Sequence, residues 1–142
     1  MSPLLRALTF NRAAHEPVTQ AMLLQAYATL DALRRGYGSV ELLRNLHWQL
    51  LMAEELCRLQ YCADELPDIE AALATIAQIG ASEQATGARP ISDIDYSRLC
   101  NALSIFDRQL SAASLGDIAK TEARVASGLM RDESAVTAAL PV

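Results

Sequence analysis

The sequence predicts an all-α protein, a single-domain antiparallel helical bundle of about five helices. Ala and Leu are its commonest residues, aromatic residues make up 5% of the chain, and no run alternates Val, Ile or Thr with polar residues. With 142 residues, the chain is long enough to form one hydrophobic core without disulfides or a metal. Prolines and glycines fall between apolar stripes of helical period, so they divide the chain into helices.

The first helix is predicted at residues 17–35. Pro17 suits the first helical position, and Gly36 suits the position just beyond the last turn. The expected buried stripe consists of Leu23, Ala26, Leu30 and Leu33. Residues 1–16 are expected to form an arm that packs onto the bundle. The apolar side chains of this arm are Leu4, Leu5, Leu8 and Phe10.

Residues 40–60 are the most informative segment, because they predict one helix with apolar residues on two faces. Ser39 is placed to cap its first turn. The first face consists of Leu46, Leu50, Ala53 and Cys57, and the second of Trp48, Met52 and Leu59. The two stripes lie about 200° apart on a helix that turns ~100° per residue, whereas a surface helix needs only one. This helix is therefore either the central post of the bundle or has a second face that meets another chain.

The third helix is predicted at residues 67–79. Pro67 ends or bends the preceding helix, and Gly80 is expected to close this one. Its apolar face consists of Ile69, Ala72, Leu73, Ile76 and Ile79. Residues 82–91 are rich in polar residues, Gly and Pro, which predicts a surface loop.

Two more helices follow from Ser-x-x-Asp signatures. Ser92 with Asp95 and Ser114 with Asp117 have the form of a capping box, with Asp in place of the usual Glu. On the fourth helix the expected inward residues are Tyr96, Leu99, Leu103, Phe106 and Leu110. On the fifth helix, whose apolar pattern is weaker, they are Ile118, Val125 and Leu129. The end of the chain has no firm pattern. The predicted division is an arm at 1–16, a bundle domain at 17–130 and a frayed tail at 131–142.

Charge and cysteine content indicate the cellular compartment in which the protein works. The net charge is −5, and most of it falls in residues 46–83. The three cysteines have no CxxC spacing, which predicts reduced thiols and a cytoplasmic protein. No window of the sequence is long and apolar enough to cross a membrane. The excess of Arg over Lys, together with the abundance of Ala, suggests a GC-rich bacterial genome.

Catalysis has little support in the sequence. A nucleophile needs a base within hydrogen-bond reach, and the only imidazoles are His15 in the predicted arm and His47 beside Trp48. His47, Cys57 and Cys62 do not share a helical face at ligand spacing, and no HxxxH, CxxC or ExxH motif occurs. We therefore expect neither an enzyme nor a bound metal or cofactor.

With catalysis disfavoured, the function that the sequence predicts is binding of another macromolecule. If the second face of the 40–60 helix is open, Trp48, Met52 and Leu59 form an apolar strip beside Arg44, with an aromatic anchor of the kind found in protein interfaces. The alternative is that Trp48 is ordinary core between the second and fourth helices. An open strip predicts an adaptor that binds a protein partner or a second copy of itself.

A DNA-binding regulator is the competing interpretation. The hairpin of residues 17–60 superficially resembles a helix-turn-helix, in which Arg44, Asn45 and Gln49 would reach base edges. Trp48 on the same flank, a pI near 4.9 and a single Lys argue against a phosphate-binding surface. Nucleic acid is therefore the less favoured partner.

Three segments carry a resemblance to a known group of proteins. They are PVTQAMLLQAYATLDALRRG at 17–36, MAEELCRLQY at 52–61 and NALSIFDRQLSAAS at 101–114. Over about residues 17–127 the chain resembles small uncharacterised helical proteins of β-proteobacteria, often near mobile elements and sometimes labelled Fis-family transcriptional regulators. That label implies a DNA-bending dimer with a basic C-terminal helix-turn-helix. In this chain the C-terminal region contains acidic residues where that label implies basic ones, so the resemblance assigns no DNA-contact residue to it.

Overall fold

The computed structural model describes the backbone of residues 15–86 and 91–139, and the side chains of residues 15–81 and 91–129. The described part consists of five α-helices and a short 3-10 helix, with no strand, which confirms the all-α bundle. The elements are α2 (His15–Arg34), α3 (Val40–Arg58), η2 (Ala63–Glu65), α4 (Leu66–Thr86), α5 (Asp93–Ala112) and α6 (Leu115–Ala139).

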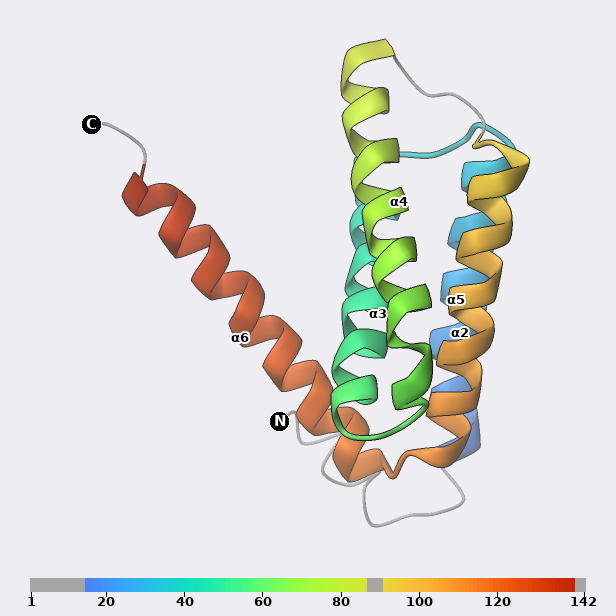
Figure 1. The fold of residues 1–142 in the computed structure, drawn as a ribbon, viewed down its shortest axis with the longest axis vertical. Helices are drawn as coiled ribbons and strands as arrows, with labels where there is room; N and C mark the ends of the chain where they lie inside the picture. Colours follow the sequence, from blue (N-terminus) through green and yellow to red (C-terminus); the bar gives the residue numbers. More distant parts are fainter. Residues whose placement is uncertain (1–14, 87–90, 140–142) are drawn as a thin grey trace.

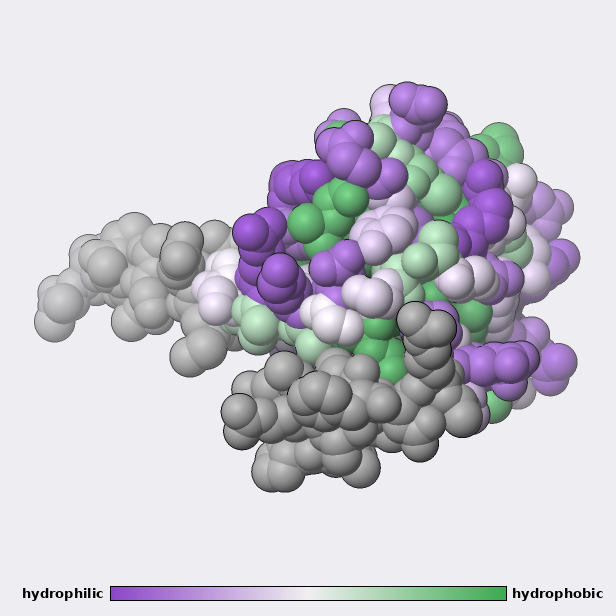
Figure 2. All heavy atoms as spheres, turned by 90° about the horizontal axis from the view of Figure 1, so that it is seen from below, coloured by the Kyte–Doolittle hydropathy of each residue, from purple (hydrophilic) through white to green (hydrophobic). Residues whose placement is uncertain are grey.

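Helices α2 to α5 stand side by side, and α6 leaves them at one end (Figure 1). Helix α3 packs against each of α2, α4, α5 and α6, which confirms that it is the central element. Helix α6 packs chiefly against α3 and then projects away from the other helices. Figure 2 views the end at which α6 begins, where apolar areas are separated by polar ones.

The predicted apolar stripes form the core. The first face of α3 is enclosed, since the exposed fractions of Leu46, Leu50, Ala53 and Cys57 do not exceed 2%. Helix α5 contributes the largest buried side chain, Phe106, flanked by buried leucines on the same stripe. Some predicted core residues lie at its margin and are only half-buried: Leu23, Leu73, Tyr96 and Leu129.

Each of the three predicted serine caps is present. Ser39 Oγ accepts a hydrogen bond from the backbone N–H of Leu42 at 3.2 Å, and Ser92 Oγ accepts one from Asp95 at 3.2 Å. Ser114 Oγ accepts one from the N–H of Asp117 at 3.0 Å. These bonds satisfy backbone donors that have no partner within the helix, so the starts of α3, α5 and α6 are fixed locally.

Helices α2 and α3 both end in a Schellman motif, with one residue in the left-handed region. After α2 this residue is Gly36, at φ 81°, as the sequence predicts. After α3 it is Gln60, at φ 76°, and the N–H of Tyr61 donates to the carbonyl of Leu56 at 3.0 Å. A side chain in this conformation is strained, because its Cβ crowds the backbone, so glycine would suit position 60 better.

We expect Gln60→Gly to raise the free energy of unfolding by about 0.5–1 kcal/mol, since it relieves this strain on an exposed residue. The matched control is Gln78→Gly, at an exposed position inside α4, which should lower stability by roughly 1 kcal/mol. Urea unfolding followed by circular dichroism measures both. Equal destabilisation by the two variants would show that the turn after α3 does not need a left-handed residue.

Two predicted helix ends are wrong. Helix α4 does not close at Gly80 but continues to Thr86, and α6 continues past residue 130 to Ala139. In both cases the chain beyond the predicted end is rich in Ala, and its helix propensity offsets the cost of about 1 kcal/mol for a helical glycine. The first helix starts slightly earlier than predicted, because His15 and Glu16 already belong to α2. The arm residues Leu4, Leu5, Leu8 and Phe10 lie outside the described residues.

Candidate functional site

The predicted partner strip on α3 is not an open strip. Met52 is 1% exposed, and Trp48 is half-buried with part of its surface packed against the core. Leu59 is also half-buried, and only Arg44 of the four proposed partner residues is exposed. The expectation that Met52 faces a partner is therefore wrong, because α3 lies among the other helices and both of its faces are used in packing.

The three residues proposed to read DNA do not share one surface. Arg44 and Asn45 are exposed, but Gln49 is buried, with an exposed fraction of 5%. The Gln49 Oε1 atom is enclosed and has no hydrogen-bond partner in the described part of the chain. Gln49 therefore cannot reach a base edge in this structure, so one of the three DNA contacts proposed for a helix-turn-helix is not available.

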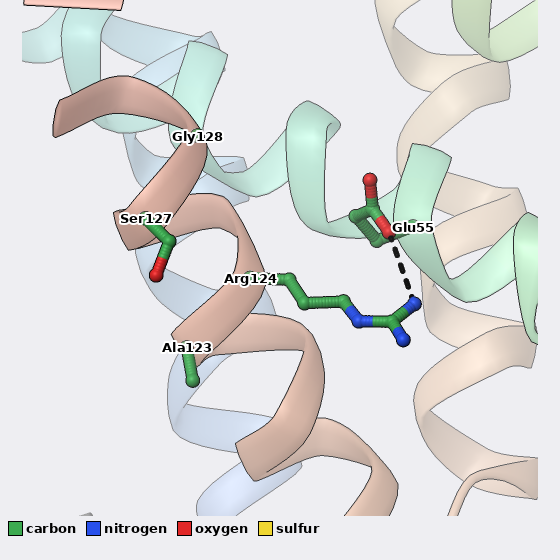
Figure 3. Close-up of a pocket in the computed structure, with 5 residues that line it drawn as sticks. All are labelled: Glu55, Ala123, Arg124, Ser127 and Gly128. Carbon is green, nitrogen blue, oxygen red and sulfur yellow. Dashed lines mark ion pairs between the residues drawn. The ribbon is translucent and has the colours of Figure 1, made fainter. Parts of the chain in front are cut away.

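An open pocket of about 520 Å³ lies between α3 and α6. It is lined by Glu55 of α3 and by Ala123, Arg124, Ser127 and Gly128 of α6 (Figure 3). Three of these five residues are small, so the α6 wall is largely backbone and leaves room between the helices. Sequence reasoning missed this pocket, since Gly128 by itself predicts only a weakness in the last helix.

The pocket carries one charge of each sign. Arg124 Nη1 lies 3.9 Å from Glu55 Oε2, and the exposed fractions of the two side chains are 65% and 19%. Glu55 is also paired with Arg58, which in turn lies 3.3 Å from Glu54. Arg124 is thus an exposed cation at the rim, held by one long ion pair that contributes little to stability. This arrangement can bind a polar or charged group.

A buried polar network joins α5 to the end of α3, and sequence reasoning also missed it. The fully enclosed Gln109 Nε2 donates to the carbonyls of Ala53 and Tyr61, at 3.0 Å each, and lies 3.2 Å from Cys57 Sγ. The hydroxyl of Tyr61 donates to Asp117 Oδ2 at 2.6 Å, which links the turn after α3 to the start of α6. The network therefore positions the two helices that form the pocket.

The titratable groups of the described residues do not form a nucleophile and base. Burial raises the pKa of the Cys57 thiol, and the hydrogen bond to Asp117 raises the pKa of Tyr61, so both groups stay protonated at neutral pH. Burial lowers the pKa of His47, which is half-buried on α3. His15 Nε2 is 2.7 Å from the carbonyl of Ala113, a contact that ties α2 to the end of α5.

Two further findings concern metal ligands and membrane-spanning segments. Among the side chains that the structure describes, those of residues 15–81 and 91–129, no three His, Cys, Asp or Glu are grouped to hold a metal ion, and the three cysteines are free thiols. None of the helices that the structure describes has the length and apolarity to cross a membrane.

No protein family matches this chain, and neither a curated protein nor a solved structure is detectably similar to it.

Proposed function

We propose that this protein is a non-enzymatic adaptor that binds another protein through the pocket between α3 and α6. The observation that carries the proposal is the path of α6, which packs against α3 near its start and then leaves the bundle (Figure 1). The pocket opens to the surface at this point and has a volume of about 520 Å³. Its small side chains would let a partner helix or loop approach the α6 backbone closely.

The pocket residues also indicate how a partner would be oriented. Arg124 is largely exposed and Glu55 is mostly covered, so an incoming carboxylate can pair with Arg124 in place of Glu55. Charges at a rim chiefly affect orientation and association rate, whereas side chains that enter a pocket contribute most of the affinity. The expected partner segment therefore inserts one apolar side chain next to Ser127 and Gly128 and places an acidic residue beside it.

The test is capture of partners from native lysate with the full chain, with and without nuclease. Ser127→Arg should fill the pocket and remove a stoichiometric protein that survives nuclease in the wild-type sample. Ser104→Arg introduces the same side chain at an exposed position on α5 and serves as the control. A protein that both variants retain would contradict binding at the pocket. Material that is lost on nuclease treatment would favour a nucleic-acid reader instead.

A further inference from the structure

The outward face of α2 has a stripe of exposed residues, and only Tyr27 within it is partly covered by α5. Its members share one arc of about 100° at ~100° per residue, turned away from the buried face of the helix. They are Glu16, Gln20, Leu24, Tyr27, Asp31 and Arg35, all exposed. The exposed fractions of its two large apolar or aromatic members are 73% for Leu24 and 40% for Tyr27. We call these six residues the α2 stripe.

The order of charges along the α2 stripe is self-complementary. If a second α2 runs antiparallel with Leu24 opposite Tyr27, then Glu16 lies opposite Arg35, and Gln20 lies opposite Asp31. Glu16 and Arg35 are each about 14 Å from the midpoint between Leu24 and Tyr27, at ~1.5 Å per residue. One twofold axis therefore brings the apolar pair together at the centre and an acid–base pair together at each end.

We propose that the α2 stripe binds a second copy of this chain, in a twofold dimer whose α2 helices are antiparallel. In a twofold interface the same patch is used by both subunits, so it must complement itself, as the α2 stripe does. The antiparallel arrangement also aligns each helix N-terminus with the C-terminus of its neighbour, which favours the two helix dipoles. Ala21 and Ala28, both exposed beside Leu24, present little bulk to a helix approaching this face.

The two arginines at the end of α2 have different partners within the subunit. The guanidinium of Arg34 lies over the Tyr96 ring of α5, 4.0 Å from its centroid, so this base is engaged within the subunit. The next base, Arg35, makes an exposed ion pair with Asp31 at 3.1 Å. Exposed pairs of this kind are weak, which leaves Arg35 able to turn to Glu16 of a second copy.

Sedimentation equilibrium over a range of protein concentrations and two salt concentrations tests the proposal. We expect a monomer–dimer equilibrium that weakens at high salt. Glu16→Arg and Arg35→Glu should each raise the dimer dissociation constant about tenfold, because two attractive pairs become repulsive. The double variant recreates both pairs with reversed signs and should return to within about threefold of the wild type. Leu24→Glu should leave only monomer.

Controls separate this surface from the rest of the molecule. Asp68→Arg reverses an exposed acid in the first turn of α4, as Glu16→Arg does in α2, and should leave the dimer unchanged. Circular dichroism checks that each variant folds. A wild type that is monomeric at every concentration, or a double variant that does not recover, would overturn the proposal. A dimer lost in Ser127→Arg but kept in Leu24→Glu would also overturn it, since the pocket would then be the dimer interface.

Discussion

Replacing Leu50 by alanine is expected to lower the free energy of unfolding by about 2–5 kcal/mol, the usual cost of truncating an enclosed leucine. Leu50 has an exposed fraction of 0% and lies on α3, the helix that packs against each of the other four α-helices that the structure describes. The cavity left by its side chain would lie in the middle of the core, where neighbouring helices cannot close it without disturbing their other contacts.

The measurement is urea unfolding at a protein concentration low enough to keep the chain monomeric. Leu24→Ala is the matched control, because it makes the same chemical change at a side chain that is 73% exposed, and it should alter stability by no more than about 0.5 kcal/mol. A similar cost for both substitutions would contradict the central position of α3.

Much of this fold could be predicted because its signals are local. A serine cap needs only the backbone three residues onward, and Ser39, Ser92 and Ser114 all make that bond. An apolar stripe likewise needs only helical spacing, so the buried face of α3 was correctly predicted. Gly36 was predicted as a helix end for the same reason, since glycine tolerates the left-handed region.

The errors arise where a wider context decides the outcome. Gly80 and Gly128 each lie inside a helix whose other residues favour it, and a Cβ placed at either position would meet no heavy atom of another element within 4 Å. Gln60 adopts a left-handed backbone conformation, which a glutamine in the sequence does not predict. Met52 and Gln49 are buried because α3 is surrounded, which depends on all of its neighbours and not on the sequence around them.

The candidate site was harder to predict than the fold. The pocket between α3 and α6 brings Glu55 next to residues about seventy positions later in the chain, and sequence spacing does not reveal such a contact. Trp48, the most conspicuous side chain of the sequence, proves to be half-buried and packed on the core. The α2 stripe is also hard to detect from the sequence. Its exposed Leu24 looks like an ordinary surface residue, and the complementary charges are seen only when two antiparallel copies of α2 are placed side by side.

We expect Gln109→Leu to lower the free energy of unfolding by about 1–3 kcal/mol, although leucine is apolar and similar in size. The substitution removes the donor that reaches the carbonyls of Ala53 and Tyr61, and leaves the Tyr61 carbonyl at the end of α3 without this partner. The loss is partly offset, because the Gln109 Oε1 atom is itself buried without a partner in the described part of the chain. Denaturant unfolding beside Gln78→Leu, an exposed control on α4, measures the net effect.

A second readout shows whether Gln109 acts on the end of α3 or on the whole bundle. Cys57 Sγ lies 3.2 Å from Gln109 Nε2 and is buried, so a thiol reagent reaches it only when this region opens. If Gln109 holds the turn after α3, Gln109→Leu should speed the labelling of Cys57 more than its loss of global stability accounts for. Labelling that follows global stability alone would place the contribution of Gln109 in the core as a whole. Because Tyr61 also bonds to Asp117 at the start of α6, a local effect would mean that Gln109 helps to position the start of α6 relative to the turn after α3.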